Sequence, residues 1–253
     1  HFAQGAWAEG DRCIASSETR LGKPRDYHLN GALLCMRALS LHMRGETTQA
    51  LTAFDALLQL GRKRGNRQFE AWALYGSAMP LIAAERFVEA TARVEAASAL
   101  MEDDADLLST LNCSAIRAQL AWIGGDIAGA IDHAEICLGL ARRIFPANFG
   151  SLDGFTLPAL VLADISGSVD TEPELRARAH ALTPEALAQS RKFASRCSIG
   201  GPRLAAARGA LAKNESLRRR YWARAEMLSR SLGMQTQLAR AVPTNRMPEA
   251  NKP

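Results

Sequence analysis

Short turn signals recur along this chain at a nearly constant interval, and this periodicity constrains the fold more than any other feature. They stand at Gly10-Asp11, Gly45-Glu46, Glu85-Arg86, Gly125-Asp126 and Lys213-Asn214, and intervals of 35, 40 and 40 residues separate the first four. Intervals of roughly 34 to 47 residues are typical of stacked helical hairpins. We therefore expect an all-α, right-handed superhelical solenoid of antiparallel hairpins with about five to six repeats.

Alanine occupies one fixed position after each of the first four turns. Ala15, Ala50, Ala90 and Ala130 each stand five residues beyond the first residue of their turn. A small side chain at a fixed point allows the two helices of a hairpin to cross closely. The pattern predicts that these four alanines are packing positions.

The regular pattern does not extend over the whole chain. We expect hairpin repeats over 1–165, an irregular helical connection over 166–202 in which Pro184 opens a helix, a final hairpin with its cap over 203–241, and a disordered tail over 242–253. The stretch from Phe155 to about Ile165 is apolar on most faces, which predicts a helix buried on all sides.

Charge is distributed unevenly along the sequence. Lys and Arg exceed Asp and Glu by 31 to 26, and the C-terminal third is the basic part. Arg218, Arg219 and Arg220 form a basic patch beside Tyr221 and Trp222, which is a weak signal for phosphate or nucleic acid. We favour ordinary solvated helix faces over a nucleic-acid partner.

The cysteines and the apolar segments bear on location. The five cysteines are odd in number and widely spread, which predicts reduced core thiols in a cytoplasmic protein. No segment has the roughly 18 uninterrupted apolar residues of a membrane span. The sequence begins at His1 within what reads as a repeat, so we expect it to be part of a longer polypeptide.

Motifs for catalysis and cofactors give no candidates. Gly22-Lys23-Pro24 lacks the upstream glycine and the hydroxyl residue of a phosphate-binding loop. His133 and Cys137 share a helix face, yet no second pair of ligands stands nearby, so a core thiol beside a partly exposed histidine is the favoured interpretation. We predict no catalytic residue, no metal site and no cofactor in this segment.

Residues at the turns and in the helices of the repeats carry a resemblance to a known family of repeat proteins. These residues are Gly45-Glu46, Ala50-Leu51, Phe54, Gly65 to Gln68, Ala71 to Leu74, Gly125-Asp126, Ala130, Ala225 to Leu228, Leu232 to Met234 and Leu238 to Ala241. With these residues the chain resembles the long-repeat tetratricopeptide regions that follow a P-loop ATPase in large bacterial signalling proteins of the adenylate or guanylate cyclase type, and in similarly built transcription activators. The resemblance implies a regulatory module that relays binding to an upstream ATPase.

A non-catalytic interaction module is therefore the predicted function, with a protein or peptide, or upstream domains of the same polypeptide, as the partner. Its groove would be lined by polar positions on first helices that packing does not demand: Asn30, Arg37, Gln68, Ser77, Asn112 and Arg117. Two alternatives stay open. One is a solenoid that binds nucleic acid or phosphate through the basic C-terminal third, and the other is an enzyme with a site in 146–202.

Overall fold

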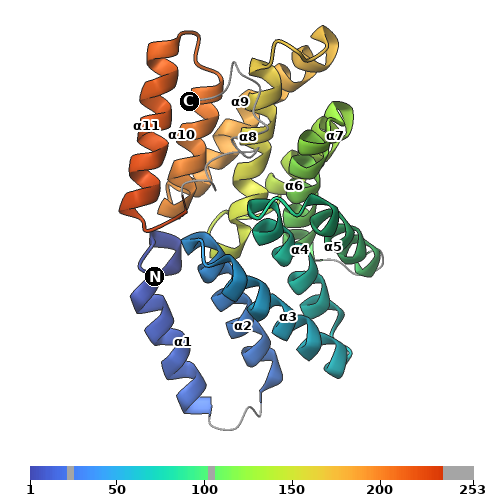
Figure 1. The fold of residues 1–253 in the computed structure, drawn as a ribbon, viewed down its shortest axis with the longest axis vertical. Helices are drawn as coiled ribbons and strands as arrows, with labels where there is room; N and C mark the ends of the chain where they lie inside the picture. Colours follow the sequence, from blue (N-terminus) through green and yellow to red (C-terminus); the bar gives the residue numbers. More distant parts are fainter. Residues whose placement is uncertain (22–25, 102–105, 236–253) are drawn as a thin grey trace.

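Paired helices make up the whole regular structure. The computed structural model describes residues 1–21, 26–101 and 106–235, and every regular element within these ranges is a helix (Figure 1). The α-helices are α1 (Trp7–Leu21), α2 (Tyr27–Arg44), α3 (Thr47–Arg64), α4 (Arg67–Ala83), α5 (Phe87–Leu100), α6 (Leu107–Gly124), α7 (Ile127–Ala141), α8 (Leu152–Gly167), α9 (Pro173–Ala194), α10 (Gly201–Ala210) and α11 (Glu215–Ser231). Three short 3-10 turns accompany them, η1 (Phe2–Gln4), η2 (Phe149–Ser151) and η3 (Ser198–Gly200). The all-helical prediction is confirmed for the described residues.

Three of the predicted turns join the two helices of a hairpin in the same way. Gly45, Glu85 and Gly125 each adopt a left-handed conformation, with φ of 85°, 60° and 86°. In each turn the next backbone N–H donates to a carbonyl five residues back, at 3.0, 2.9 and 2.9 Å. This cap satisfies the last carbonyls of a helix and reverses the chain. At the last predicted turn, the Asn214 side chain caps α11 by accepting from the Leu217 N–H at 2.8 Å.

The first predicted turn is wrong, because α1 runs straight through Gly10-Asp11. Gly10 is required there for a close approach. A Cβ atom at this position would lie 2.0 Å from Cε1 of Phe2, so only glycine lets that ring pack on the helix. The turn that precedes α1 is instead at Gly5, whose φ is 74°.

The alanine register holds at the three left-handed hairpin turns. Ala50, Ala90 and Ala130 are fully buried. Ala15 lies on the exposed side of α1. The packing role predicted for Ala15 is therefore wrong, for the same reason that its turn is absent.

Successive hairpins are joined through their first helices. A Cβ at Gly31 of α2 would lie 2.2 Å from the Phe69 ring of α4, so these two helices touch closely. Between α4 and α6, the Trp72 indole donates to the Ser109 hydroxyl at 3.0 Å. Helices α2, α4 and α6 thus lie next to one another, as expected for a repeat array.

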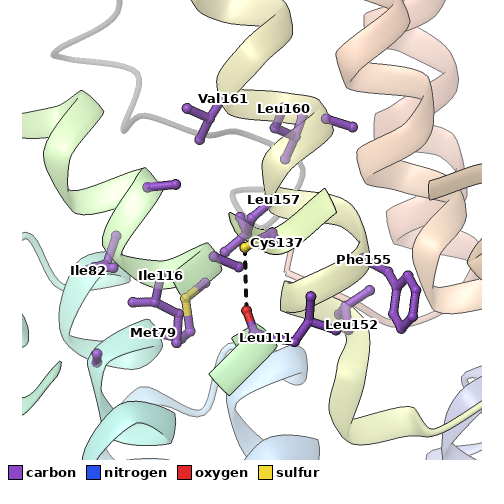
Figure 2. Packing of buried hydrophobic residues seen from close by; sticks show 14 of the residues in the cluster. Met79, Ile82, Leu111, Ile116, Cys137, Leu152, Phe155, Leu157, Leu160 and Val161 are labelled. Atoms are coloured by element: carbon purple, nitrogen blue, oxygen red, sulfur yellow. Dashed lines mark hydrogen bonds between the residues drawn. The ribbon is translucent and has the colours of Figure 1, made fainter. Parts of the chain in front are cut away.

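Helix α8 is the centre of the core. All its residues from Leu152 to Ile165 are buried, and it packs against α6, α7, α9 and α10. Figure 2 shows its apolar side chains facing those of α4, α6 and α7 around Cys137, whose thiol donates to the Leu111 carbonyl. The prediction of a helix buried on all sides over 155–165 is confirmed.

The segment expected as an irregular connection contains the long helix α9. Pro184 lies inside α9 and does not open a helix. Its ring is exposed, and the carbonyl that its missing N–H leaves unbonded belongs to the exposed residue His180, where water can replace the hydrogen bond. The stripe Ala179, Ala186 and Phe193 is buried, and this packing keeps the helix continuous through the proline.

The two ends of the described chain meet. The Trp7 indole of α1 donates to the Leu232 carbonyl just beyond α11, at 2.5 Å, and the Gln235 N–H donates to the Met43 carbonyl of α2 at 2.8 Å. The N-terminus therefore lies beside the base of α11 (Figure 1). The predicted tail, 242–253, and the end of the predicted cap, 236–241, lie outside the described residues.

Candidate functional site

The six predicted groove residues differ widely in exposure. Gln68 and Arg117 are exposed, and Asn30 and Arg37 are half-buried. Ser77 and Asn112 are buried, with exposed fractions of 0% and 3%. Four of the six therefore present a side chain at the surface.

Asn112 and Ser77 have internal structural roles. The Asn112 amide donates to the Gly150 carbonyl at 2.8 Å and accepts from the Gly154 N–H at 3.0 Å, which fastens the start of α8 to α6. The Ser77 hydroxyl donates to the Leu74 carbonyl within α4. The expectation that packing does not demand these polar groups is wrong for Asn112, because the backbone groups at the start of α8 need side-chain partners.

The exposed members of the set do not converge. Arg37 pairs with Glu18 of α1 at 3.1 Å, and the Gln68 amide donates to Asp106 at the start of α6. The charge of Arg117 in α6 is, after burial, the next cause that lowers the pKa of His133 in α7. Arg37 and Gln68 therefore contact different neighbours, which are α1 and the start of α6.

The predicted basic patch is also dispersed. Glu215, one turn earlier in α11, lies 2.9 Å from Arg219 and 3.6 Å from Arg218. Arg220 is exposed on another side of the helix, because consecutive residues are about 100° apart around it. The single carboxylate of Glu215 therefore offsets one of the three positive charges of this run.

A different set of arginines lines a single cleft, between the end of α9, α10 and α11. The cleft has a volume of about 400 Å³, and we call it the arginine cleft. Its polar lining residues are Arg191, Ser195, Ser198, Arg208, Tyr221 and Arg224. Within the described part of the chain, no Asp or Glu lines the cleft, and none of its three guanidinium groups has an ion-pair partner. A concave wall with charge of one sign concentrates an electrostatic field.

Helical spacing brings these residues together. Gly201, Leu204, Ala205 and Arg208 follow the i, i+3, i+4, i+7 pattern on α10, and the stripe Tyr221, Arg224 and Leu228 faces them from α11. Arg191 lies in the last turn of α9. The two stripes are visible in the sequence, but only the packing of α9 on the final hairpin places Arg191 beside them.

A second charged centre lies in the core and has no access to the cleft. Arg203 of α10 is 2% exposed, and one of its guanidinium nitrogens donates to the Asp153 carboxylate at 2.6 Å and to the Thr156 hydroxyl at 3.0 Å. His42 of α2 is 3% exposed, and neither ring nitrogen has a hydrogen-bond partner among the described residues. Burial lowers the pKa of His42 to about 4, with smaller opposing contributions from Asp153 and Arg203.

The region 146–202 contains one ionisable group whose pKa is strongly shifted. Burial raises the pKa of Asp164 in α8 to about 7, and the neighbouring Trp122 indole lowers it in part. Asp164 is 4% exposed and does not line the arginine cleft. Across residues 1–21, 26–101 and 106–235, no group of three or more His, Cys, Asp or Glu side chains is arranged to hold a metal ion.

The cysteines differ in burial. Cys113, Cys137 and Cys197 are buried as predicted, Cys35 is half-buried, and Cys13 is exposed, contrary to the prediction of a core thiol. None of the helices described above combines the length and the apolar character that crossing a membrane requires.

Comparisons with known proteins add no family. The chain matches no protein-family model, and the curated proteins give no match either. The arginine cleft, with charge, concavity and open access together, is the best candidate site in the described structure.

Proposed function

We propose that this chain is a non-catalytic interaction module that recognises an anionic group on its partner in the arginine cleft. The observation that carries the proposal is that Arg191, Arg208 and Arg224 all line one hollow whose lining contains no carboxylate. Many arginines elsewhere in the described chain have a carboxylate partner, as Arg142 has in Glu185 at 2.6 Å and Arg178 in Asp132 at 2.7 Å. Unpaired guanidinium groups in a cleft attract a complementary anion.

The packing supports a binding role for this end of the molecule. The walls of the cleft are helices, which hold side chains in place better than loops do. Helices α10 and α11 approach closely because glycine stands at the contact: a Cβ at Gly209 would lie 3.3 Å from the Tyr221 Cβ. The cleft is therefore a preformed feature of the final hairpin.

The finer architecture and the context of the module belong to the same proposal. The hairpins are proposed to form a right-handed tetratricopeptide-like superhelix of five to six repeats, which the close contacts of α2, α4 and α6 favour. By the sequence resemblance, we propose a cytoplasmic location in a larger signalling protein with an ATPase or nucleotide cyclase domain. Nucleic acid is a less suitable partner, because Glu215 neutralises part of the basic run at 218–220.

A direct test uses a fluorescein-labelled peptide of ten Asp and Glu residues, with a Gly and Ser peptide of equal length as its control. We expect anisotropy titration of the intact chain to show binding to the acidic peptide that weakens as salt rises from about 50 to about 200 mM. The variant R191Q/R208Q/R224Q should lose at least roughly tenfold in affinity.

The matched control is K63Q/R143Q/R220Q, which removes three exposed cationic residues outside the cleft and changes the net charge equally. It should keep most of the affinity of the unmodified chain. An equal loss in both triple variants would show that net charge alone attracts the peptide, and the proposed role of the cleft would then be rejected.

A further inference from the structure

The residues that line the arginine cleft indicate which kind of anion it binds. We infer that the cleft binds the phosphomonoester group of a small organic molecule. This inference rests on the proposed function, because it names the anion for the same site. It is carried by three features of the lining: the number of arginine residues, the Tyr221 hydroxyl as a further donor, and apolar side chains beside them.

The guanidinium groups favour a dianion with three terminal oxygens over a carboxylate. Arg191, Arg208 and Arg224 line the cleft from three different helices. A carboxylate has only two oxygens, which lie in one plane, and a single arginine fork can bind both of them. A phosphomonoester carries about 1.5 to 2 negative charges at pH 7 and three acceptor oxygens, which suits donors arriving from several sides.

Hydroxyl groups also line the cleft, and one of them can donate a further hydrogen bond to a phosphate. Tyr221, Ser195 and Ser198 line the same cleft. The Ser195 hydroxyl donates to the Lys192 carbonyl, and the Ser198 hydroxyl contacts the Gln4 side chain. Both serine protons are already donated within the protein and a phosphate dianion only accepts hydrogen bonds, so the Tyr221 hydroxyl is the one of these three groups that can donate to a phosphate oxygen.

The apolar part of the lining argues for an organic ligand over inorganic phosphate. Ala194, Leu204, Ala205 and Leu228 complete the wall of the cleft. A volume of about 400 Å³ lies within the usual range for small-molecule sites. An apolar body attached to the phosphate would cover these side chains and gain affinity from their burial.

Phenyl phosphate is the probe, and inorganic phosphate and benzenesulfonate are its comparison ligands. Phenyl phosphate has the anion and an apolar body, inorganic phosphate lacks the body, and benzenesulfonate has the body with one negative charge. Isothermal titration of the intact chain at about pH 7.5 should give saturable binding of phenyl phosphate with a Kd of about 1 mM or tighter. The comparison ligands should each bind at least about fivefold more weakly.

The pH dependence separates a dianion from any other anion. The second pKa of a phosphomonoester is about 6, so affinity for phenyl phosphate should fall several-fold between about pH 7.5 and pH 5. Affinity for benzenesulfonate should stay constant over that range. The charged and titratable groups that line the cleft are Arg191 of α9, Arg208 of α10, and Tyr221 and Arg224 of α11.

Variants locate the site. R208Q and R224Q should each weaken phenyl phosphate binding about tenfold, and R208K should lose several-fold despite its charge, because lysine lacks the planar fork. K63Q/R143Q/R220Q should bind as the unmodified chain does. Circular dichroism of each variant should show unchanged helicity, since the three cleft arginines make no ion pair within the described structure that folding would need.

Several results would overturn the inference. These are the absence of saturable binding up to roughly 10 mM phenyl phosphate, equal affinity for benzenesulfonate, equal affinity for inorganic phosphate, or equal losses in the cleft and control variants. If the acidic peptide binds in an Arg191-, Arg208- and Arg224-dependent way while phenyl phosphate does not bind, the ligand class is wrong and the interaction module stands. If neither binds, both proposals fail.

Discussion

Replacing Asp153 with asparagine should destabilise this protein more than any single change to a surface ion pair. The substitution keeps the shape of the side chain and removes its charge. Arg203 would then keep a positive charge at 2% exposure beside a neutral amide, in place of the carboxylate that now accepts its hydrogen bond at 2.6 Å. A buried charge without its counter-charge is among the largest single-site penalties in a folded protein.

The expected magnitude follows from this geometry. Removing one partner of a buried ion pair costs about 3 to 5 kcal/mol, and the Thr156 hydroxyl remains to hydrogen-bond Arg203, so we expect about 3 kcal/mol. Spread over the unfolding entropy of 253 residues, this loss corresponds to a decrease in Tm of about 6 °C. The free energy of unfolding should be measured by urea titration at about pH 7.5, with both circular dichroism and fluorescence as probes.

Two controls isolate the effect. Asp132→Asn breaks the ion pair between Asp132 and Arg178. The side chains of Arg178 and Asp132 are 42% and 58% exposed, so this change should cost less than about 0.5 kcal/mol of stability. The double variant Asp153→Leu with Arg203→Met removes both buried charges and should recover most of the loss. A cost below about 1 kcal/mol for Asp153→Asn, or no recovery in the double variant, would refute the assignment of this pair as a buried charge centre.

Three further outcomes are expected from the same kind of reasoning. The folded-state pKa of His42 is lowered to about 4, so its contribution to the free energy of unfolding is present above the unfolded pKa near 6.5 and is lost as pH falls towards 4. Urea titrations over this range should show that the stability of His42→Leu depends less on pH than that of the unmodified chain. The pKa of Asp164 is raised to about 7, so its contribution to the free energy of unfolding is present below pH 3.8 and is lost as pH rises through 7. At about pH 8, urea titration should therefore show Asp164→Asn to be more stable than the unmodified chain by on the order of 3 kcal/mol. At the turns, Gly125→Ala should cost about 1 kcal/mol of stability through its φ of 86° alone, because a Cβ there meets nothing within 4 Å. Glu85→Gly, at φ 60°, should be neutral or stabilising when both variants are compared by thermal unfolding. A loss for Glu85→Gly as large as that of Gly125→Ala would show that the side chain of Glu85 matters more than its backbone conformation.

Some features of the candidate site were within reach of the sequence and others were not. The stripes on α10 and α11 follow helical spacing, so helical periodicity alone suffices to place Arg208 and Arg224 each on the lining face of its own helix. The run Arg218 to Arg220 is the more conspicuous signal, but adjacent residues on a helix diverge and Glu215 lies one turn away. Density of charge along the sequence is therefore a poor guide to density of charge in space.

Local chemistry determined the hairpins from the sequence alone. Left-handed caps at Gly45 and Gly125, small residues at Ala50 and Ala130, and the all-apolar stretch that became α8 all act over a few residues, so their outcome is independent of the rest of the chain. The same local reasoning placed a turn at Gly10, where the close approach of the nearby Phe2 ring decides the residue instead.

Tertiary packing decided which polar and charged groups meet. Asp153 and Arg203 are 50 residues apart, and Trp7 and Leu232 are 225 apart, and no periodicity links either pair. The assembly of the arginine cleft likewise depends on how α9 docks against the final hairpin. Helix formation is governed by near neighbours along the chain, whereas these contacts follow from burying the α8 face on several helices at once, which only the complete fold specifies.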